Sequence, residues 1–319
     1  SGGPVLIMGD NGKVSWKFNV GKTGFYSIQV EYYTGQVEVF DPEGNKVSEG
    51  KDAAVERYLL IDGKVPFKEA RSIEFARVWA DVYTVVDQSG KPVLDADGKK
   101  QTYLSNSKEF IDFVTDQSKV QKDSERLFLR DGNGNEIKPD KTLVEQWTSA
   151  FLSDSTGYYA DPFKIYLTEG EHVMTFQTVR EPMAIKSISF CKAEVPPTYE
   201  EYLKEHQDAR DYDGDESLLI QGEYATGTSE RTIYQLNDRS STYTQPQDAS
   251  KIRLNQIGGN KWQYVGQWVE WTINVPEDGF YNIIPRSKQG YYAGIYVSRR
   301  LYINDKVPFQ EAGKLRFAY

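Results

Sequence analysis

The chain contains one pattern twice, and this repeat constrains its fold more than any other feature. The first block reads VSWKFNVGKTGFYSI at 14–28 and VEWTINVPEDGFYNI at 269–283. The second block reads RYLLIDGKVPFKEA at 57–70 and RRLYINDKVPFQEA at 299–312. The copies of the first block lie 255 residues apart (14 to 269), and those of the second lie 242 apart (57 to 299). Solenoid repeats have periods of about 20–50 residues, so this spacing predicts two copies of a whole domain.

Both copies of the first block alternate apolar and polar residues, which is typical of a strand with one buried face. The apolar positions are 14, 16, 18 and 20 in one copy and 269, 271, 273 and 275 in the other. We therefore expect Trp16 and Trp271 to point into a core. Within the second block, Asp62-Gly63 and Asn304-Asp305 predict tight hairpin turns.

The strand patterns, the turns and the lack of long helical periodicity predict an all-β chain. We expect two jelly-roll-type antiparallel β-sandwich domains joined by a short helical linker. The first domain is assigned to 1–194, with an irregular insertion at about 84–128 that contains a short helix at 108–115. The linker is assigned to 195–216, where Thr198 and Glu201 form a capping box. The second domain is assigned to 217–319.

The second copy is expected to be incomplete. Phe317 matches Phe75 of the first copy, and the sequence ends two residues later, whereas the first copy continues to Phe190. We therefore expect the second sandwich to lack its closing strands, and the chain to be a segment of a longer protein. Unpaired sheet edges invite pairing with another chain.

Composition excludes several classes of function. The net charge is −9 with no concentration of Lys and Arg, which argues against a nucleic-acid partner. No apolar run approaches the roughly 20 residues of a membrane helix. The single cysteine, Cys191, can form neither an intrachain disulfide nor a cysteine metal cluster. There are two histidines, and no nucleophile elbow, zinc-protease motif or phosphate-binding loop occurs, so we expect no catalysis.

Aromatic residues are abundant, at 13% of the chain, with 22 Tyr and 6 Trp. Their flat apolar faces and polar edges suit stacking on sugar rings. Strands also favour aromatic residues, so a purely structural use remains open. Tyr158-Tyr159 and Tyr291-Tyr292 are paired next to glycine, where a ring face can be exposed.

The order of motifs resembles that of a known family. The second copy, IQGEYAT followed by SKIRLNQIGGNKWQYVGQWVEWTINVPEDGFYNI, resembles β-sandwich carbohydrate-binding modules of families six and thirty-five. The first copy's EGEHVMTFQTVREPMAIKSISF resembles the closing strands of those modules. With the linker PPTYEEY, the arrangement is similar to the paired module region of large extracellular solute-binding proteins of bacterial sugar uptake transporters.

This resemblance implies a site. Family sugar sites lie in loops at one edge of the sandwich, and a structural calcium often sits near the opening glutamate, which is Glu223 here. The implied hydrogen-bonding residues are Arg253 and Asn260. The implied stacking residues are the loop aromatics of both modules: Trp79, Tyr83, Trp147, Tyr158, Tyr159, Trp262, Tyr264, Tyr291 and Tyr292. The second module has the shorter loop and is the favoured site.

Three hypotheses follow for function. The first is a non-catalytic glycan-binding region of an exported sugar-capture protein, extracellular and attached to the cell surface through sequence outside this segment. The second is a structural spacer or protein-docking region without a sugar site. The third is an accessory module of a glycoside hydrolase. The expected partner is an oligo- or polysaccharide, with a transporter membrane component or another chain at the open strand edges.

Overall fold

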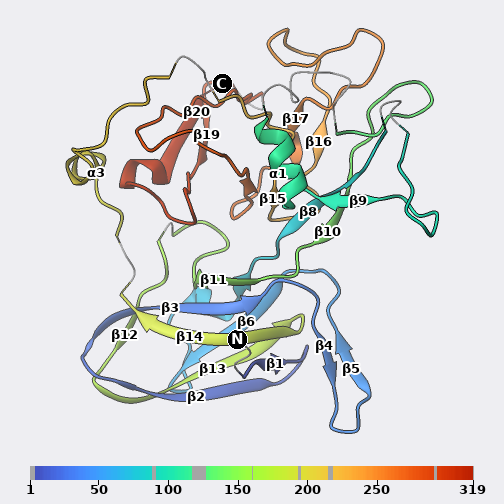
Figure 1. Cartoon of the computed structure of the whole chain (residues 1–319). Helices are drawn as coiled ribbons and strands as arrows, with labels where there is room; N and C mark the ends of the chain where they lie inside the picture. The colour runs from blue at the N-terminus through green and yellow to red at the C-terminus, as the bar shows by residue number, and fades with distance from the viewer. Residues whose placement is uncertain are drawn as a thin grey trace. The chain divides into compact units, whose positions relative to one another are not determined.

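Strands dominate the computed structural model, which describes residues 4–87, 91–116, 127–159, 161–192, 195–214, 218–290 and 293–318 (Figure 1). Strand accounts for 36% and helix for 9%, and the sheets are antiparallel, so the predicted all-β class is confirmed. By contact the chain forms two units, Ser1–Cys191 with Leu219–Asn274, and Lys192–Leu218 with Val275–Tyr319. The sequence analysis had instead divided the chain at the linker. The jelly-roll connectivity and the division at 194 and 217 stay predictions.

Two antiparallel sheets of the first unit share one apolar core. Their strand orders are β1-β14-β3-β11, with β12 also paired to β3, and β2-β13-β6-β7. The bounds are β1 Leu6–Met8, β2 Lys13–Val20, β3 Gly24–Tyr33, β6 Val55–Ile61, β7 Ile73–Phe75, β11 Trp147–Phe151, β12 Ile165–Leu167, β13 Gly170–Arg180 and β14 Met183–Cys191. Val30, Leu59 and Phe176 from the two sheets meet in the core. As predicted, Trp16 packs against it, with its ring 6.0 Å from that of Phe176.

The consecutive strands β13 and β14 tie the two sheets together. β13 lies between β2 and β6, and β14 lies between β1 and β3. Among the described residues, β2 pairs with β13 alone, whereas β6 pairs with both β13 and β7. A separate hairpin, β4 (Glu38–Phe40) with β5 (Lys46–Glu49), extends from this part of the chain.

The insertion of the first copy folds with a segment from much later in the sequence. β8 (Trp79–Thr84) pairs with β9 (Thr102–Leu104), β10 (Asp140–Leu143) and β15 (Gly227–Thr228), and β15 pairs with β18 (Val269–Glu270). The predicted short helix is present as α1 (Lys108–Thr115), N-capped by the Ser107 hydroxyl. Its Phe110 packs on Tyr83 and Tyr224. The first copy's insertion and the start of the second copy thus share one core.

The second block of the repeat folds the same way in both copies. β6 pairs with β7, and β19 (Tyr296–Arg299) pairs with β20 (Leu315–Ala318). The register is preserved, since Val55 lies opposite Phe75 and Val297 lies opposite Phe317. A 3-10 turn precedes the second strand each time, η1 (Lys68–Arg71) and η4 (Gln310–Lys314).

The turns inside these hairpins also match. Asp62 and Asn304 have φ of 50° and 49°, and the next residues, Gly63 and Asp305, have φ of 73° and 62°. Asparagine, aspartate and glycine tolerate this left-handed region best, which explains the residue types at both turns. The predicted hairpin turns are therefore confirmed.

The first block behaves differently in its two copies. In the second copy, strand is limited to β18, and residues 271–290 have only a single bridge at Phe280. In the first copy β2 pairs with β13, and β3 pairs with β11, β12 and β14. Those partners come from residues 147–191, which occur once in the sequence. The pairing of β6 with β7 lies within the second block, and the same pairing forms between β19 and β20.

The remaining elements are short. β16 (Gln235–Leu236) pairs with β17 (Gln256–Ile257), and η3 (Gly259–Lys261) follows. α3 (Tyr199–Glu205) begins with the predicted capping box, in which the Thr198 hydroxyl and the Glu201 carboxylate each accept from the other residue's backbone N–H. Within the described residues, no helix is long and apolar enough to cross a membrane.

Candidate functional site

A turn after β11 holds two adjacent tyrosines in solvent. The Asp154 carboxylate accepts from the backbone N–H of Thr156 at 2.9 Å, from its hydroxyl at 2.6 Å, and from the backbone N–H of Tyr159 at 3.1 Å. Burial opposes ionisation of Asp154, but these hydrogen bonds outweigh it and lower its pKa. Tyr158 is 87% and Tyr159 58% exposed. The turn is therefore fixed from within while its rings face water.

A second loop, 262–267, is organised by the side chain of Gln267. Its carbonyl oxygen accepts from the backbone N–H groups of Gln263 and Tyr264 at 2.8 and 2.9 Å. Its amide donates to the Glu230 carboxylate at 2.9 Å, and its backbone carbonyl accepts from the Trp262 indole at 3.2 Å. Tyr264 is 68% exposed, whereas Trp262 is half-buried. This loop also presents a tyrosine on a fixed backbone.

The two loops meet at a glycine. Gly157 has φ of 74°, and a Cβ added to it would lie 1.9 Å from Cγ1 of Val265. A Cβ on Gly266 would likewise lie 3.4 Å from the carbonyl oxygen of Ser155. Tyr158 directly follows Gly157, and Tyr264 directly precedes Val265. We name the exposed residues Tyr158, Tyr159 and Tyr264, with this loop contact, the tyrosine junction.

Two other predicted stacking residues are buried instead. Trp79 is 5% and Tyr83 1% exposed, both on β8. The Tyr83 ring stacks on that of Phe110 with centroids 4.9 Å apart, and burial raises the pKa of its phenol. Tyr83 belongs to the core around Phe110 and Tyr224, and neither ring is accessible to a ligand in this structure.

The other predicted aromatics fall elsewhere. Trp147 on β11 is 39% exposed, with its ring centroid 5.5 Å from that of Tyr33. Trp271, expected to point inward, is half-buried, and its indole donates to the carbonyl of Gly222 at 3.1 Å. Tyr291 and Tyr292 lie outside the described residues.

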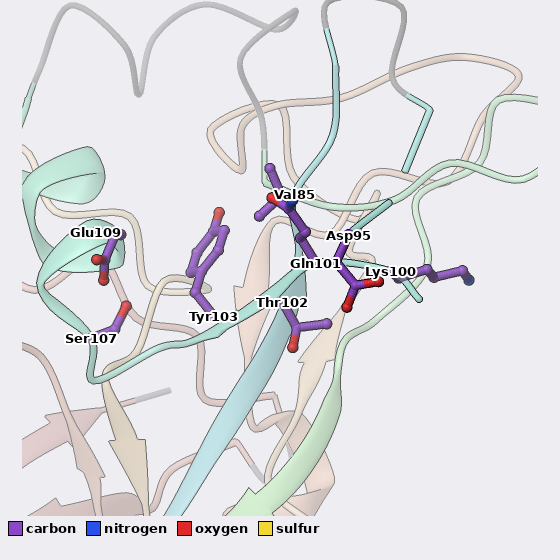
Figure 2. A pocket seen from close by; sticks show the side chains of 8 residues that line it. All are labelled: Val85, Asp95, Lys100, Gln101, Thr102, Tyr103, Ser107 and Glu109. Carbon is purple, nitrogen blue, oxygen red and sulfur yellow. The ribbon is translucent and has the colours of Figure 1, made fainter. Parts of the chain in front are cut away.

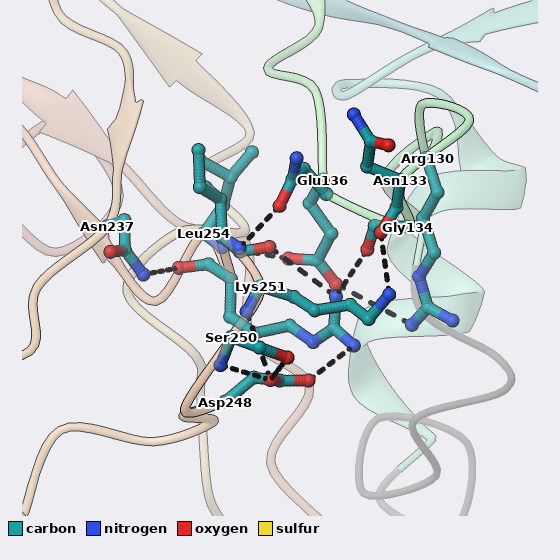
Figure 3. Close-up of polar contacts among 12 residues, drawn as sticks. Arg130, Asn133, Gly134, Glu136, Asn237, Asp248, Ser250, Lys251 and Leu254 are labelled. Atoms are coloured by element: carbon teal, nitrogen blue, oxygen red, sulfur yellow. Dashed lines mark hydrogen bonds and ion pairs between the residues drawn. The ribbon is translucent and has the colours of Figure 1, made fainter.

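Arg253, a predicted sugar ligand, is used within the chain. It is 7% exposed and donates to the carbonyl of Gly134 at 2.9 Å and to the Asp248 carboxylate at 3.1 Å. Figure 3 shows the surrounding contacts, including the Glu136 carboxylate accepting from the Leu254 N–H at 2.8 Å. These bonds fasten the turn at 131–136 to residues 248–254. The other predicted polar ligand, Asn260, is exposed in η3.

Glu223, the predicted calcium ligand, is 1% exposed. Its backbone carbonyl accepts from the amide of Gln235 at 3.1 Å. Across the described part of the chain, no three His, Cys, Asp or Glu residues are grouped as a metal ion requires. Among those described residues, Glu223 therefore does not belong to such a group.

One open pocket of about 660 Å³ lies in the insertion (Figure 2). Its lining is mixed, with the carboxylates of Asp95 and Glu109, the ammonium of Lys100 and the ring of Tyr103. Burial raises the pKa of Tyr103 to about 12, which keeps its phenol neutral. The pocket contains none of the predicted site residues.

Comparison with known protein families, with curated proteins and with solved structures finds no match to this chain. Sequence reasoning selected the three tyrosines of the junction but not the residues that position them, Asp154, Gly157 and Gln267. The turn residues D-S-T-G at 154–157 are a local signal for the first loop. No local signal pairs it with a loop about a hundred residues later.

Proposed function

We propose that this chain is a non-catalytic glycan-binding region and that the tyrosine junction is its sugar site. The observation that carries the proposal is the exposure of Tyr158, Tyr159 and Tyr264 beside one glycine-mediated contact between two loops. Tyrosine rings offer flat apolar surface to the C–H face of a sugar ring, and their hydroxyls hydrogen-bond its substituents.

The way the loops are held also favours binding. Each backbone is fixed by hydrogen bonds to a side chain of its own loop, Asp154 in one and Gln267 in the other. A site that is ordered before binding loses less conformational entropy when the ligand arrives. This matters for sugars, because their polar surface offers little apolar area to bury.

The resemblance to carbohydrate-binding modules supports a wider proposal. Under this wider proposal, the chain is the jelly-roll module region of an exported protein that captures sugar for a transporter. It acts outside the cell and without catalysis. A calcium near Glu223 would be structural in such a module. Of the predicted stacking residues of the second module, Tyr264 belongs to the tyrosine junction, whereas Trp262 is half-buried and its indole is hydrogen-bonded.

A glycan array followed by affinity electrophoresis on the retained polysaccharide tests the proposal. Tyr158→Ala and Tyr264→Ala should each abolish retention without lowering the melting temperature appreciably. Tyr243→Ala is the matched control, because Tyr243 is a tyrosine exposed to 76% outside the junction. Retention that survives both junction variants would refute the site.

A second candidate function is a structural spacer or docking region. The burial of Trp79 and Tyr83 and the internal bonding of Arg253 favour it, since these predicted ligands serve the core. An array on which no glycan binds above background would favour this spacer role over the sugar site.

A further inference from the structure

The turn at 131–136 places an asparagine–glycine pair in solvent. Its backbone is fixed by the Asp131 carboxylate, whose Oδ1 accepts from the N–H groups of Asn133 at 2.8 Å and Asn135 at 2.9 Å. Asn133 is exposed, and Gly134 has φ of 78°. Glycine suits this left-handed position, and without a Cβ it leaves its amide nitrogen open to the side chain of the residue before it. The pair is therefore suited to ring closure between the Asn133 carboxamide and the Gly134 nitrogen.

An ammonium group lies at the peptide bond where this closure takes place. Nζ of Lys251 donates to the carbonyl oxygen of Asn133 at 2.6 Å (Figure 3). A Cβ added to Gly134 would lie 2.9 Å from that Nζ and 3.2 Å from Cδ, so the Lys251 side chain passes directly over the glycine. The carbonyl is conjugated with the Gly134 nitrogen. A positive charge beside its oxygen therefore favours loss of the Gly134 amide proton.

A second turn of the same build offers a comparison within the chain. Oδ1 of Asp95 accepts from the N–H groups of Asp97 at 3.0 Å and Lys99 at 2.9 Å. Gly98 has φ of 77°, and its N–H donates to the carbonyl of Asp95 at 3.1 Å, as that of Gly134 does to the matching carbonyl at 2.9 Å. Among the described residues, however, no atom lies within 4 Å of a Cβ added to Gly98. The lysine over the glycine is thus a feature of the turn at 131–136 and not of this turn type.

We propose that Asn133 is a deamidation site and that Lys251 promotes the reaction. The Gly134 nitrogen gives up its proton to solvent and attacks Cγ of the Asn133 side chain. The ammonium stabilises the negative charge that spreads onto the peptide oxygen, as preorganised donors do at other reacting carbonyls. The new N–Cγ bond closes a succinimide, and the side-chain nitrogen takes up a proton and leaves as ammonia. Water then opens the ring at either carbonyl, which yields aspartate or isoaspartate.

Isoaspartate loosens the contact between this turn and residues 248–254. Its backbone carries one extra methylene, so the groups that follow it in the chain are displaced. Two of these groups hold the second segment. The carbonyl of Gly134 accepts from Arg253 at 2.9 Å, and Oδ1 of Asn135 accepts from the Ile252 N–H at 2.9 Å. The reaction is therefore a slow release of residues 248–254 that is built into the turn.

Peptide mapping of the whole chain during incubation at neutral pH tests the chemistry. We expect deamidation at Asn133, with ion exchange resolving a form that carries one more negative charge. Lys251→Met should slow the reaction by about tenfold, because it removes a charge-assisted hydrogen bond from the reacting peptide. Lys251→Arg keeps the charge and should restore most of the rate. A turn loosened by the substitution would react faster, so a slower Lys251→Met cannot be explained by lost structure.

Amide hydrogen exchange tests the consequence. Ile252 and Leu254 donate their N–H groups to the side chains of Asn135 and Glu136 at 2.9 and 2.8 Å, and both amides should exchange faster in the isoaspartyl form. Asn133→Asp is the matched control, since it adds the same charge with an unchanged backbone. Its exchange at these two amides should stay close to that of the parent.

The proposal is overturned if Asn133 stays intact while Asn11, in the chain's other Asn-Gly pair, deamidates. A Lys251→Met variant that reacts as fast as the parent or faster would leave the ammonium without a role. Equal rates in Lys251→Arg and Lys251→Met would show that the charge does not activate the peptide. Equal exchange in the isoaspartyl form and in Asn133→Asp would show that the longer backbone releases nothing.

Discussion

The carboxylate of Asp81 lies 2.7 Å from the ammonium of Lys141, and the two side chains are 1% and 3% exposed. The amide of Gln235 donates to the other oxygen of Asp81 at 2.6 Å, and Lys141 donates to the hydroxyl of Thr228 at 3.1 Å. Burial raises the pKa of Asp81, while Lys141 and Gln235 act in the opposite direction. Each charge in this core therefore depends on the other.

Removing one partner of this pair should be costly. Lys141→Met leaves a buried carboxylate without a counter-ion, and we expect the free energy of unfolding to fall by about 3–5 kcal/mol in urea denaturation. The double variant Asp81→Leu/Lys141→Met should recover much of that loss. Lys17→Met removes the exposed pair with Glu171 and serves as the control, with little expected change. Equal effects at both lysines would contradict the role given to burial.

The pair His172–Asp62 should make stability depend on pH. Its Nδ1 lies 2.7 Å from the Asp62 carboxylate and its Nε2 2.8 Å from the carbonyl of Thr168. Asp62, and then Thr168, raise the pKa of His172 above its ordinary 6.5. The raised pKa means that the histidine's contribution is complete below about pH 6.5 and disappears as pH rises through the folded-state pKa.

Melting temperatures between pH 5.5 and pH 9 check this. Asp62→Asn places at this turn the residue that the second copy has as Asn304, and it should remove most of the histidine's pH effect. His206→Gln, at the exposed end of α3, should leave the effect intact. A pH profile that is unchanged in Asp62→Asn would show that the ion pair contributes nothing.

Gly157→Ala should separate the loops of the tyrosine junction. The added methyl would lie 1.9 Å from Val265, so the loops must move apart. Amide exchange at Gln263 and Tyr264 should speed up as their bonds to Gln267 loosen. Gly44→Ala is the control, with a comparable φ of 86° and no atom within 4 Å of the added Cβ. If the two variants lose equal stability and 263–264 exchange is unaltered, the loops do not support each other.

Asp305→Gly should stabilise the β19–β20 hairpin. Asp305 has φ of 62°, where a non-glycine residue is strained, and its counterpart is Gly63. We expect a gain of about 0.5–1 kcal/mol, offset in part by the greater freedom of glycine in the unfolded chain. The reverse exchange, Gly63→Asp, should destabilise β6–β7. Slower amide exchange at Ile303 and Lys306, which bond each other across the turn, is the readout.

Features set by neighbouring residues could be predicted from the sequence. The alternation around Trp16, the hairpin turns at Asp62 and Asn304, the helix at 108–115 and the capping box at Thr198 all depend on contacts a few residues apart. Hydrogen bonds and steric limits of this range act in any tertiary setting. For the same reason, the second block of the repeat folds alike in both copies.

Features set by distant partners could not be predicted. The apolar–polar alternation of the first block predicted strand in both copies, but residues 271–290 contain none. In the first copy the same pattern pairs with strands from residues 147–191. The type of an aromatic residue does not show whether its side chain is buried, so the sequence alone did not distinguish Tyr83 from Tyr158. The structure separates them, with Tyr83 under Phe110 and Tyr158 beside the loop contact.

The shared core of the insertion also has a consequence for synthesis. Asp81 and Gln235, which bond each other in that core, are 154 residues apart in the chain. At roughly 5–20 residues per second, Asp81 is made roughly 8–30 s before Gln235. During that interval β8 has no β15 beside it, and the rings of Tyr83 and Phe110 are without Tyr224. Until residues 224–235 have been made, this part of the apolar core therefore stays incomplete.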